Sequence, residues 1–179
     1  MAGLAALRGM HDILPEETAR LHEIETLMHA MFRQYAFSEI RLPLLEKTEL
    51  FVRGVGEVTD IVEKEMYVFQ DRGGDSIALR PEGTAGCVRA LIEHHLARGH
   101  SPRLYYHGPM FRYERPQKGR YRQFYQWGAE CFGVSGPHIE AEILALTHRL
   151  FQALNITAEL QINTLGTAAS RSEHRHALI

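Results

Sequence analysis

Two strand-like runs joined by a short arginine-rich loop, all within residues 103–134, constrain the fold of this chain most strongly. The sequence predicts strands over 103–113 and 122–134, which the loop joins directly. The second run carries four residues at every other position: Phe124, Gln126, Gly128 and Glu130. Alternate residues of a strand point to one face, so this face carries an aromatic ring, an amide, a gap and a carboxylate. Beside a loop that suits phosphates, such a face suits a nucleotide and a small cationic or polar molecule.

The loop is basic in a chain whose net charge is −2. One acid, Glu114, stands among five cations: Arg112, Arg115, Lys118, Arg120 and Arg122. Arginine side chains bind phosphate oxygens through two parallel hydrogen bonds. A solvated charged loop is the ordinary explanation of an arginine cluster. Here, however, Arg112 and Glu114 flank Tyr113 at a strand end and face the same side, which a purely structural loop does not need.

Two further features have both a structural and a functional interpretation. Residues 80–84, RPEGT, are predicted to lead from a strand into a helix, which places Glu82 and Thr84 at the helix N-terminus. Acidic and hydroxyl side chains cap helices at this position, but Glu82 and Thr84 could equally bind an α-amino group. Glu130 lies among apolar neighbours in a predicted central strand, where an unpaired carboxylate is costly. A partner such as an ammonium or an imidazole would offset that cost.

Hairpins join most of the predicted strands, so we expect an α+β fold with a largely antiparallel sheet rather than a doubly wound parallel one. A hairpin is expected over 66–80, and further strands over 37–45 and 157–164. Pro43 directs the strand at 37–45 to an edge or an interface. Helices are expected over four ranges: 16–35, 83–98, 137–153 and 167–179.

Composition and absent motifs exclude several classes of protein. Hydrophobic content of 45% and charged content of 23% are typical of a soluble globular domain. No apolar run is long enough to cross a bilayer, and the opening MAGLAALRG is not a secretion signal, so we expect a cytoplasmic protein without a membrane partner. The two cysteines do not suggest a disulfide framework. Neither HExxH nor a common glycine-rich phosphate motif occurs, and no protein-held metal is predicted.

The same segments resemble bacterial histidyl-tRNA synthetases, a family of class II aminoacyl-tRNA synthetases, along essentially all 179 residues. The resemblance is to the N-terminal part of the catalytic domain. Its most specific segments are LRPEGTAGCVRA and GPMFRYERPQKGRYRQF, and LRGMHDILPEE and GVGEVTDIVEKEM also match. Residues 20–50 resemble class II motif 1, which implies a homodimer, and residues 107–134 resemble motif 2. The implied fold is a class II core, a mostly antiparallel sheet flanked by helices.

The resemblance also implies roles for the candidate residues. On ATP, Arg112 would contact the α-phosphate and Arg120 the γ-phosphate. Glu114 would contact the adenine amino group, and Phe124 would stack on the adenine ring. Arg112 would also contact the histidine carboxylate and would be the catalytic residue, because it stabilises charge developing at the phosphorus. L-Histidine would be bound by Arg112 together with Glu82, Gly83, Thr84, Gln126 and Glu130. Glu130 would take the imidazole, and Glu82, Thr84 and Gln126 the α-amino group.

The implied reaction is activation of L-histidine by ATP to histidyl-adenylate and transfer to tRNA(His), with Mg²⁺ accompanying the nucleotide. Motif 3, the histidine-specific segment and the anticodon-binding domain of the family have no counterpart in residues 1–179. We therefore expect a partial catalytic domain, truncated before motif 3, with weak or absent aminoacylation by itself.

Two alternatives stay open. A histidine-binding, synthetase-like regulatory subunit of histidine biosynthesis would share the fold, and a bare dimerisation module would need only motif 1. The complete set of loop arginines favours a synthetase over a histidine sensor, because a sensor needs no contact with the γ-phosphate of ATP.

Overall fold

Two three-stranded sheets organise the part of the chain that this computed structural model describes, residues 3–55, 61–163 and 166–177. The first has the order β1-β5-β6 and consists of β1 (Ser38–Glu39), β5 (Arg103–Phe111) and β6 (Gln123–Cys131). The second has the order β2-β4-β3 and consists of β2 (Leu45–Lys47), β4 (Ser76–Leu79) and β3 (Val68–Gln70). Only β1 and β5 pair in parallel among these strands, so the predicted α+β, largely antiparallel architecture is confirmed.

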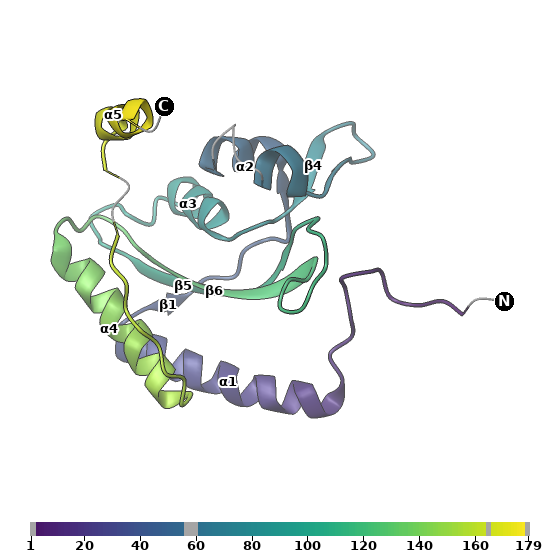
Figure 1. Cartoon of the computed structure of the whole chain (residues 1–179), viewed down its shortest axis with the longest axis horizontal. Coiled ribbons are helices and arrows are strands. Elements are labelled where there is room, and N and C mark those ends of the chain that lie inside the picture. The colour runs from purple at the N-terminus through teal and green to yellow at the C-terminus, as the bar shows by residue number, and fades with distance from the viewer. Residues whose placement is uncertain (1–2, 56–60, 164–165, 178–179) are drawn as a thin grey trace.

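Helices cover both faces of the first sheet. Figure 1 shows α1 and α4 on one side of β5 and β6, and α2 and α3 on the other. The described helices are α1 (Pro15–Gln34), α2 (Thr48–Val55), α3 (Thr84–Glu93), α4 (Pro137–Ala153) and α5 (Ala168–Ala177), with a short π-helical turn η1 (Ile61–Glu65). None of the helices in this part of the chain is long and apolar enough to cross a membrane.

The side chains of β5 alternate between two cores, as a strand requires. On the odd face, Tyr105 packs against Phe32 of α1 with ring centroids 4.5 Å apart, and Leu146 of α4 joins the same cluster. On the even face, Tyr106 and Met110 pack with Cys87 of α3. Each helix layer therefore has its own apolar cluster, and β5 connects the two.

The long helix α1 begins where the sequence indicates. Pro15 occupies the first turn, followed by Glu16 and Glu17, whose negative charges favour a helix N-terminus. The helix buries Met28 and Phe32 against the sheet and leaves its other faces exposed. Burial on one stripe, rather than propensity alone, holds such a helix in place.

A buried arginine, Arg80, connects the two sheets at the end of β4. Its side chain is 4% exposed, and Nη1 and Nε donate to the carbonyls of Leu42 and Pro109, each at 2.9 Å. A longer contact of 3.5 Å reaches the carbonyl of Pro43. Burial lowers the pKa of this guanidinium, although three backbone acceptors surround it. Arg80 therefore holds β5 and the segment before β2 at a fixed separation.

Two of the strand predictions were wrong over part of their length. The expected strand at 37–45 divides into β1 and the start of β2, and residues 40–44 belong to neither sheet but connect the first to the second. Pro43 cannot donate to a ladder, and the carbonyls of this segment bind Arg80 instead. Residues 157–163 of the expected strand at 157–164 form no strand and lie exposed, with residues 158–160 beside α4; residue 164 lies outside the described residues.

The helix predictions were more accurate, with one omission. Helices over 16–35 and 137–153 are confirmed, whereas the helix expected over 83–98 ends as α3 at Glu93. The helix expected over 167–179 is confirmed for Ala168–Ala177, and residues 178–179 lie outside the described structure. Sequence analysis assigned no element to α2, although Leu50 and the fully buried Phe51 indicate its apolar face.

A cluster of ionisable and aromatic groups lies between α1 and the odd face of the first sheet. His107 stacks on Trp127 with ring centroids 4.3 Å apart, and its ring centroid lies 5.0 Å from that of His29. His29 Nδ1 is 2.7 Å from the hydroxyl of Tyr105, and Glu39 Oε1 is 3.9 Å from His107 Nε2. Burial, with a smaller effect of His29, holds the pKa of His107 below its ordinary value of 6.5.

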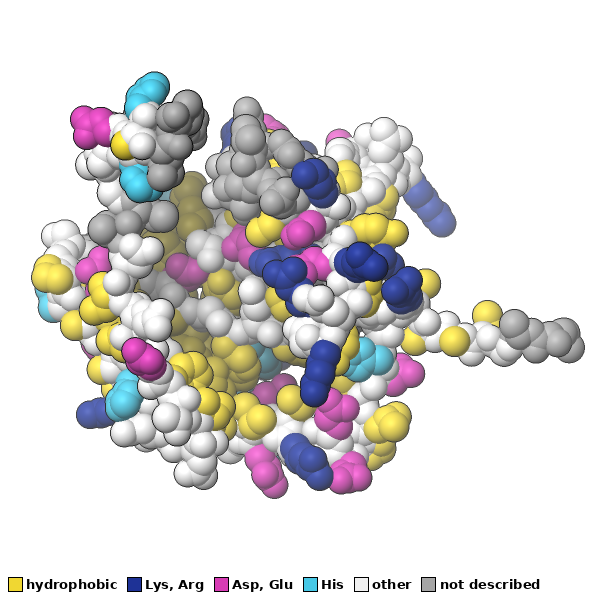
Figure 2. Space-filling model, in the orientation of Figure 1, with side chains coloured by type: hydrophobic (Ala, Val, Ile, Leu, Met, Phe, Trp, Pro, Cys, Tyr) yellow, Lys and Arg dark blue, Asp and Glu magenta, His cyan; other side chains and the backbone are white. Residues whose placement is uncertain are grey.

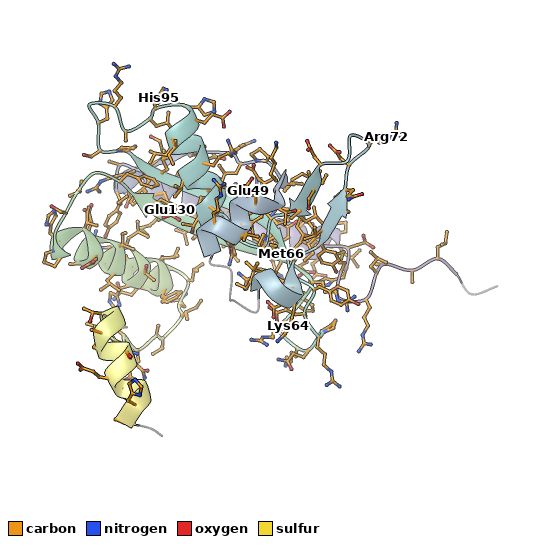
Figure 3. The ribbon with its side chains drawn as sticks, turned by 90° about the horizontal axis from the view of Figure 1, so that it is seen from above. Glu49, Lys64, Met66, Arg72, His95 and Glu130 are labelled. Carbon is orange, nitrogen blue, oxygen red and sulfur yellow. The ribbon has the colours of Figure 1, made fainter. Side chains whose placement is uncertain are left out.

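Replacement of Arg80 by methionine should destabilise the fold by about 3 kcal/mol, because it leaves buried carbonyl acceptors without a donor. Urea unfolding followed by circular dichroism measures the loss. The control is Arg72→Met: Arg72 is exposed at the tip of the β3–β4 hairpin (Figure 3) and should tolerate the change. Equal stability of the two variants would contradict the connecting role of Arg80.

The low pKa of His107 predicts a pH dependence. As the pH falls below about 6.5, the unfolded chain takes up a proton that folded His107 does not, so the free energy of unfolding decreases. His107→Phe keeps an aromatic ring on Trp127 but removes this titration, and should flatten the curve of urea midpoint against pH between about pH 7.5 and 5. His22→Gln, at a side chain that is 81% exposed, is the control and should leave the curve unchanged.

Candidate active site

Glu130 lies at the meeting point of three elements. Its Oε1 accepts a hydrogen bond from Thr84 Oγ1 at 2.8 Å, at the start of α3, and one from the Tyr106 hydroxyl of β5 at 3.3 Å. The two hydroxyl oxygens are themselves 3.3 Å apart. Figure 3 shows Glu130 within the body of the molecule, near the helices that cover this face. The structure therefore brings together Thr84 and Glu130, two of the candidate residues.

Glu82 caps the N-terminus of α3. Its Oε2 accepts from the backbone N–H of Thr84 at 2.5 Å, and its Oε1 accepts from that of Ala85 at 3.0 Å. Of the two interpretations that the sequence allowed, capping is the one these contacts demonstrate. A carboxylate oxygen has a second lone pair, so the cap does not prevent Glu82 from accepting a further hydrogen bond.

Tyr106 is the site residue that sequence analysis missed. It pairs with Gly128 across the β5–β6 ladder, and a Cβ added at Gly128 would lie 2.2 Å from its ring. A Cβ added at Gly83 would lie 2.1 Å from the same ring. The gap at Gly128, expected to make room for a ligand, is occupied by Tyr106 in this structure. A glycine opposite a buried tyrosine on a predicted neighbouring strand was the signal that could have found it.

The same packing sets the chemistry of the Tyr106 hydroxyl. Burial, with Glu130 nearby, raises its pKa to about 12. The phenol therefore keeps its proton at neutral pH and can serve as a hydrogen-bond donor to the carboxylate. Glu130 is held in place by two hydroxyl groups rather than by a cation, which leaves its negative charge available to a ligand.

Arg112 and Phe124 form the second part of this face. Arg112 Nε donates to the carbonyl of Pro81 at 2.9 Å, and its guanidinium carbon lies 5.1 Å from the centroid of the Phe124 ring. Both contacts orient the terminal guanidinium nitrogens, which make no hydrogen bond within the described part of the chain. Gln126 lies between Phe124 and Glu130 along β6, opposite Gly108, and is half-buried.

Glu114 has an unusual environment beside the loop. Its side chain is 14% exposed, and Oε2 lies 3.4 Å from Arg120 Nε in an ion pair. That contact lacks hydrogen-bond geometry, and among the described residues Oε2 is a buried oxygen without a hydrogen bond. A buried acceptor of this kind is costly, so it favours an N–H group from a bound molecule. Arg120 itself is largely exposed.

A hollow of about 400 Å³ opens next to Glu114. It is lined by Arg8, Tyr113, Glu114, Arg115, Pro116 and Arg122. Lysine and arginine side chains gather on the face that carries the loop (Figure 2). Arg8 comes from the segment before α1, and sequence analysis had not assigned it to the site. The hollow therefore combines three guanidinium groups with one buried carboxylate, which suits an anion that also carries a hydrogen-bond donor.

A larger hollow, of about 620 Å³, lies between α2 and α3 and is mostly apolar. Glu82 and Thr84 reach its edge, but Leu50, Val88 and Ile92 form much of its wall. It includes neither Arg112 nor Glu130, but it borders the polar face described above through Glu82 and Thr84. Among the described residues, no group of three or more His, Cys, Asp or Glu side chains could hold a metal ion.

The tight fit of Tyr106 against Gly128 is testable. Gly128→Ala should destabilise the chain by about 1–3 kcal/mol, because the new methyl group overlaps the buried ring. Gly86→Ala is the control: Gly86 is buried, but the nearest side-chain atom, of Leu42, would lie at an ordinary 3.5 Å from the new Cβ. Thermal unfolding compares the two, and a Gly128→Ala variant as stable as Gly86→Ala would rule out this packing.

Comparison with known proteins agrees with these observations. A family model described as histidyl-tRNA synthetase matches residues 9–169. A histidine–tRNA ligase of Alkalilimnicola ehrlichii is 56% identical over 178 residues, which are 99% of this chain and 42% of that protein. The chain thus spans less than half of this relative. Part of the matched family segment, residues 56–60 of GVGEVTDIVEKEM, lies outside the described structure.

Solved structures share this fold, and one of them is also similar in sequence. The apo histidyl-tRNA synthetase of S. aureus superposes with a TM-score of 0.79 at 40% identity, covering 98% of this chain and 41% of that one. An ATP phosphoribosyltransferase regulatory subunit/histidyl-tRNA synthetase from Bacillus halodurans has a TM-score of 0.72 at 24% identity, covering 85% of this chain and 38% of that one, and shares the fold. The fold, the motifs and these matches together show that the chain belongs to the histidyl-tRNA synthetase family, within the class II aminoacyl-tRNA synthetases.

Proposed function

We propose that this chain carries the histidine-binding and ATP-binding part of a histidine–tRNA ligase. The observation that carries the proposal is the pairing, on one face of β6, of a carboxylate held by two hydroxyl groups with an arginine oriented over an aromatic ring. A carboxylate suits the cationic or hydrogen-bonding imidazole, and a guanidinium suits phosphate. Membership of the family supports the same division of roles.

Histidine binds at the Glu130 end of the face. Within the described structure, both hydrogen bonds to Glu130 end on Oε1, so Oε2 can accept the imidazole N–H. The α-amino group lies toward the start of α3 and is bound by Glu82, Thr84 and Gln126. Gly83 belongs to the same proposed histidine site through the family resemblance, and the Tyr106 ring fills the space that a side chain at Gly83 would occupy. Tyr106 acts through Glu130 and fixes the orientation of its carboxylate.

ATP binds at the loop end. Phe124 supports the adenine ring, and the buried Oε2 of Glu114 accepts from the adenine amino group, which removes the cost of its missing hydrogen bond. Arg112 contacts the α-phosphate and the histidine carboxylate, and the exposed Arg120 swings from Glu114 to the γ-phosphate. Mg²⁺ comes with the nucleotide, whose phosphate oxygens are ligands it prefers, and offsets their negative charge.

The reaction needs no nucleophilic side chain. A carboxylate oxygen of histidine attacks the α-phosphorus, the bond to the bridging oxygen breaks, and pyrophosphate leaves. A ribose hydroxyl of tRNA(His) then attacks the carbonyl carbon of histidyl-adenylate, and AMP leaves. Arg112 accelerates the first step because its charge stabilises the negative charge that develops on the phosphoryl oxygens. The remaining residues hold both substrates in line for attack.

Assembly and location are part of the same proposal. We infer a homodimer formed through motif 1, residues 20–50, in the cytoplasm. Large apolar side chains stay exposed along and near this segment, among them Ile24, Leu44 and Leu45. Such side chains are typical of a surface that another protein covers.

Two substitutions should separate the two substrates. Arg112→Ala should weaken ATP binding about tenfold or more, since it removes charge-assisted hydrogen bonds to phosphate, and leave a smaller effect on histidine. Glu130→Gln keeps the shape of the side chain but removes its charge, and should weaken histidine binding by a similar factor with ATP unaffected. Isothermal titration calorimetry with each ligand measures both.

Arg98→Ala, at an exposed arginine outside the site, is the control for lost charge. Histidine binding with no affinity for ATP in the unmodified chain would contradict the ligase and favour a histidine sensor. An Arg112→Ala variant with normal affinity for ATP would refute the assignment of the loop.

A further inference from the structure

The segment before α1 contacts the arginine-rich loop through the backbone of Gly9. The carbonyl of Gly9 accepts the backbone N–H of Arg122 at 2.8 Å and that of Gln123 at 3.3 Å. Arg122 and Gln123 are where the loop ends and β6 begins, so the lead-in segment extends the hydrogen bonding of the hairpin beyond its own two strands. A bond from Met10 N–H to the carbonyl of Leu7, 2.9 Å long, closes a turn around this contact.

Gly9 is the residue type that this contact requires. Its φ of +84° is a backbone conformation that residues with a side chain rarely adopt. A Cβ at this position would also lie 2.9 Å from Arg122 Cγ and 3.0 Å from Pro116 Cγ. The lead-in thus touches both arms of the loop, the outgoing one at Pro116 and the returning one at Arg122.

Arg122, which is hydrogen-bonded to Gly9, also contacts residues of the candidate nucleotide site. Its guanidinium carbon lies 3.9 Å from the centroid of the Tyr113 ring, and its Nε donates to the carbonyl of Glu114 at 3.2 Å. Its carbonyl accepts the N–H of Arg112 at 2.9 Å. A displacement of Arg122 would therefore move Glu114 and Arg112, which border the nucleotide side of the face. A further contact, between His11 and Tyr121 with ring centroids 4.4 Å apart, adds to the same anchor.

We propose that residues 7–12 act as a brace for the nucleotide-binding loop, with Gly9 as a positioning residue that sets the affinity for a nucleoside triphosphate. The brace holds Arg122, and through it Glu114 and Arg112, in place before the ligand arrives. Preorganisation of this kind lowers the ordering cost of binding. The part of the proposal that concerns the nucleotide depends on the proposed function, whereas the brace itself does not.

The brace predicts where the loop becomes mobile. Lys118 and Arg120 are exposed trypsin sites at the loop tip, while Arg115 is followed by Pro116 and resists cleavage. Gly9→Ala should increase the rate of cleavage after Lys118 and Arg120 by about fivefold to thirtyfold, the effect expected when the anchored conformation is strained. Mass spectrometry of timed digests identifies the cleaved bonds.

Gly74→Ala is the matched control. Gly74 has nearly the same backbone conformation, with φ of +89°, but a Cβ there meets nothing within 4 Å, and the residue lies in the β3–β4 hairpin. It therefore reproduces the backbone strain without the contact. His11→Ala is a second variant that introduces no backbone strain, and it should accelerate loop cleavage in the same direction by a smaller factor.

Calorimetry on the same proteins tests the nucleotide part. Gly9→Ala should raise the Kd for ATP about tenfold and leave the Kd for histidine within about twofold, because Glu130 and Thr84 lie away from the brace. An increase in both Kd values would indicate a general structural defect and overturn the positioning role. Faster loop cleavage with an unchanged Kd for ATP would overturn it as well.

The two failures can be told apart. If the unmodified chain binds no ATP, the proposed function fails, and the cleavage rates still decide whether the brace exists. If Gly9→Ala and Gly74→Ala are cleaved at the rate of the unmodified chain, the brace is refuted whatever the chain binds.

Discussion

The nine-residue ladder between β5 and β6 is the constraint on which the rest of this structure depends. Its register runs from Arg103 opposite Cys131 to Phe111 opposite Gln123. Because side chains alternate along a strand, one register divides the sheet into an apolar face for α1 and α4 and a more polar face for α3. A slip of one residue would exchange these faces and bury Glu130 among aromatic rings.

Two polar side chains, the buried Arg80 and the half-buried Glu130, then determine how the surrounding elements dock on that ladder. Arg80 joins the two sheets through backbone carbonyls, and Glu130 joins β6 to α3 and β5 through hydroxyl groups. Such groups are costly to bury unless every partner is present, so they favour one arrangement over near alternatives. The loop contrasts with this frame at its tip, which is exposed and carries a Gln117–Arg120 bridge, whereas its returning end at Arg122 is hydrogen-bonded to Gly9.

Much of the fold and of the candidate site could be predicted from local patterns. The helices α1 and α4, the β5–β6 hairpin and the common face of Phe124, Gln126 and Glu130 all follow from spacing alone. The errors have a physical pattern. The segment expected as a strand at 157–164 has suitable residues but joins neither sheet over its described length, and the segment at 37–45 passes from one sheet to the other where Arg80 binds its carbonyls. Which strands pair depends on the tertiary structure, and no local sequence pattern specifies it.

By itself, the sequence determined which chemistry is present: a basic loop, a strand with a carboxylate on its ligand face, and segments that identify a synthetase family. Only the tertiary structure decided what these groups contact. It placed Tyr106 in the gap at Gly128, turned Glu82 into a helix cap, and brought Gly9 against Arg122. The reason is that alternation and spacing specify the direction of a side chain along its own element. Contacts between residues far apart in sequence depend instead on how whole elements pack. The register of the β5–β6 ladder and a few polar side chains together determine that packing.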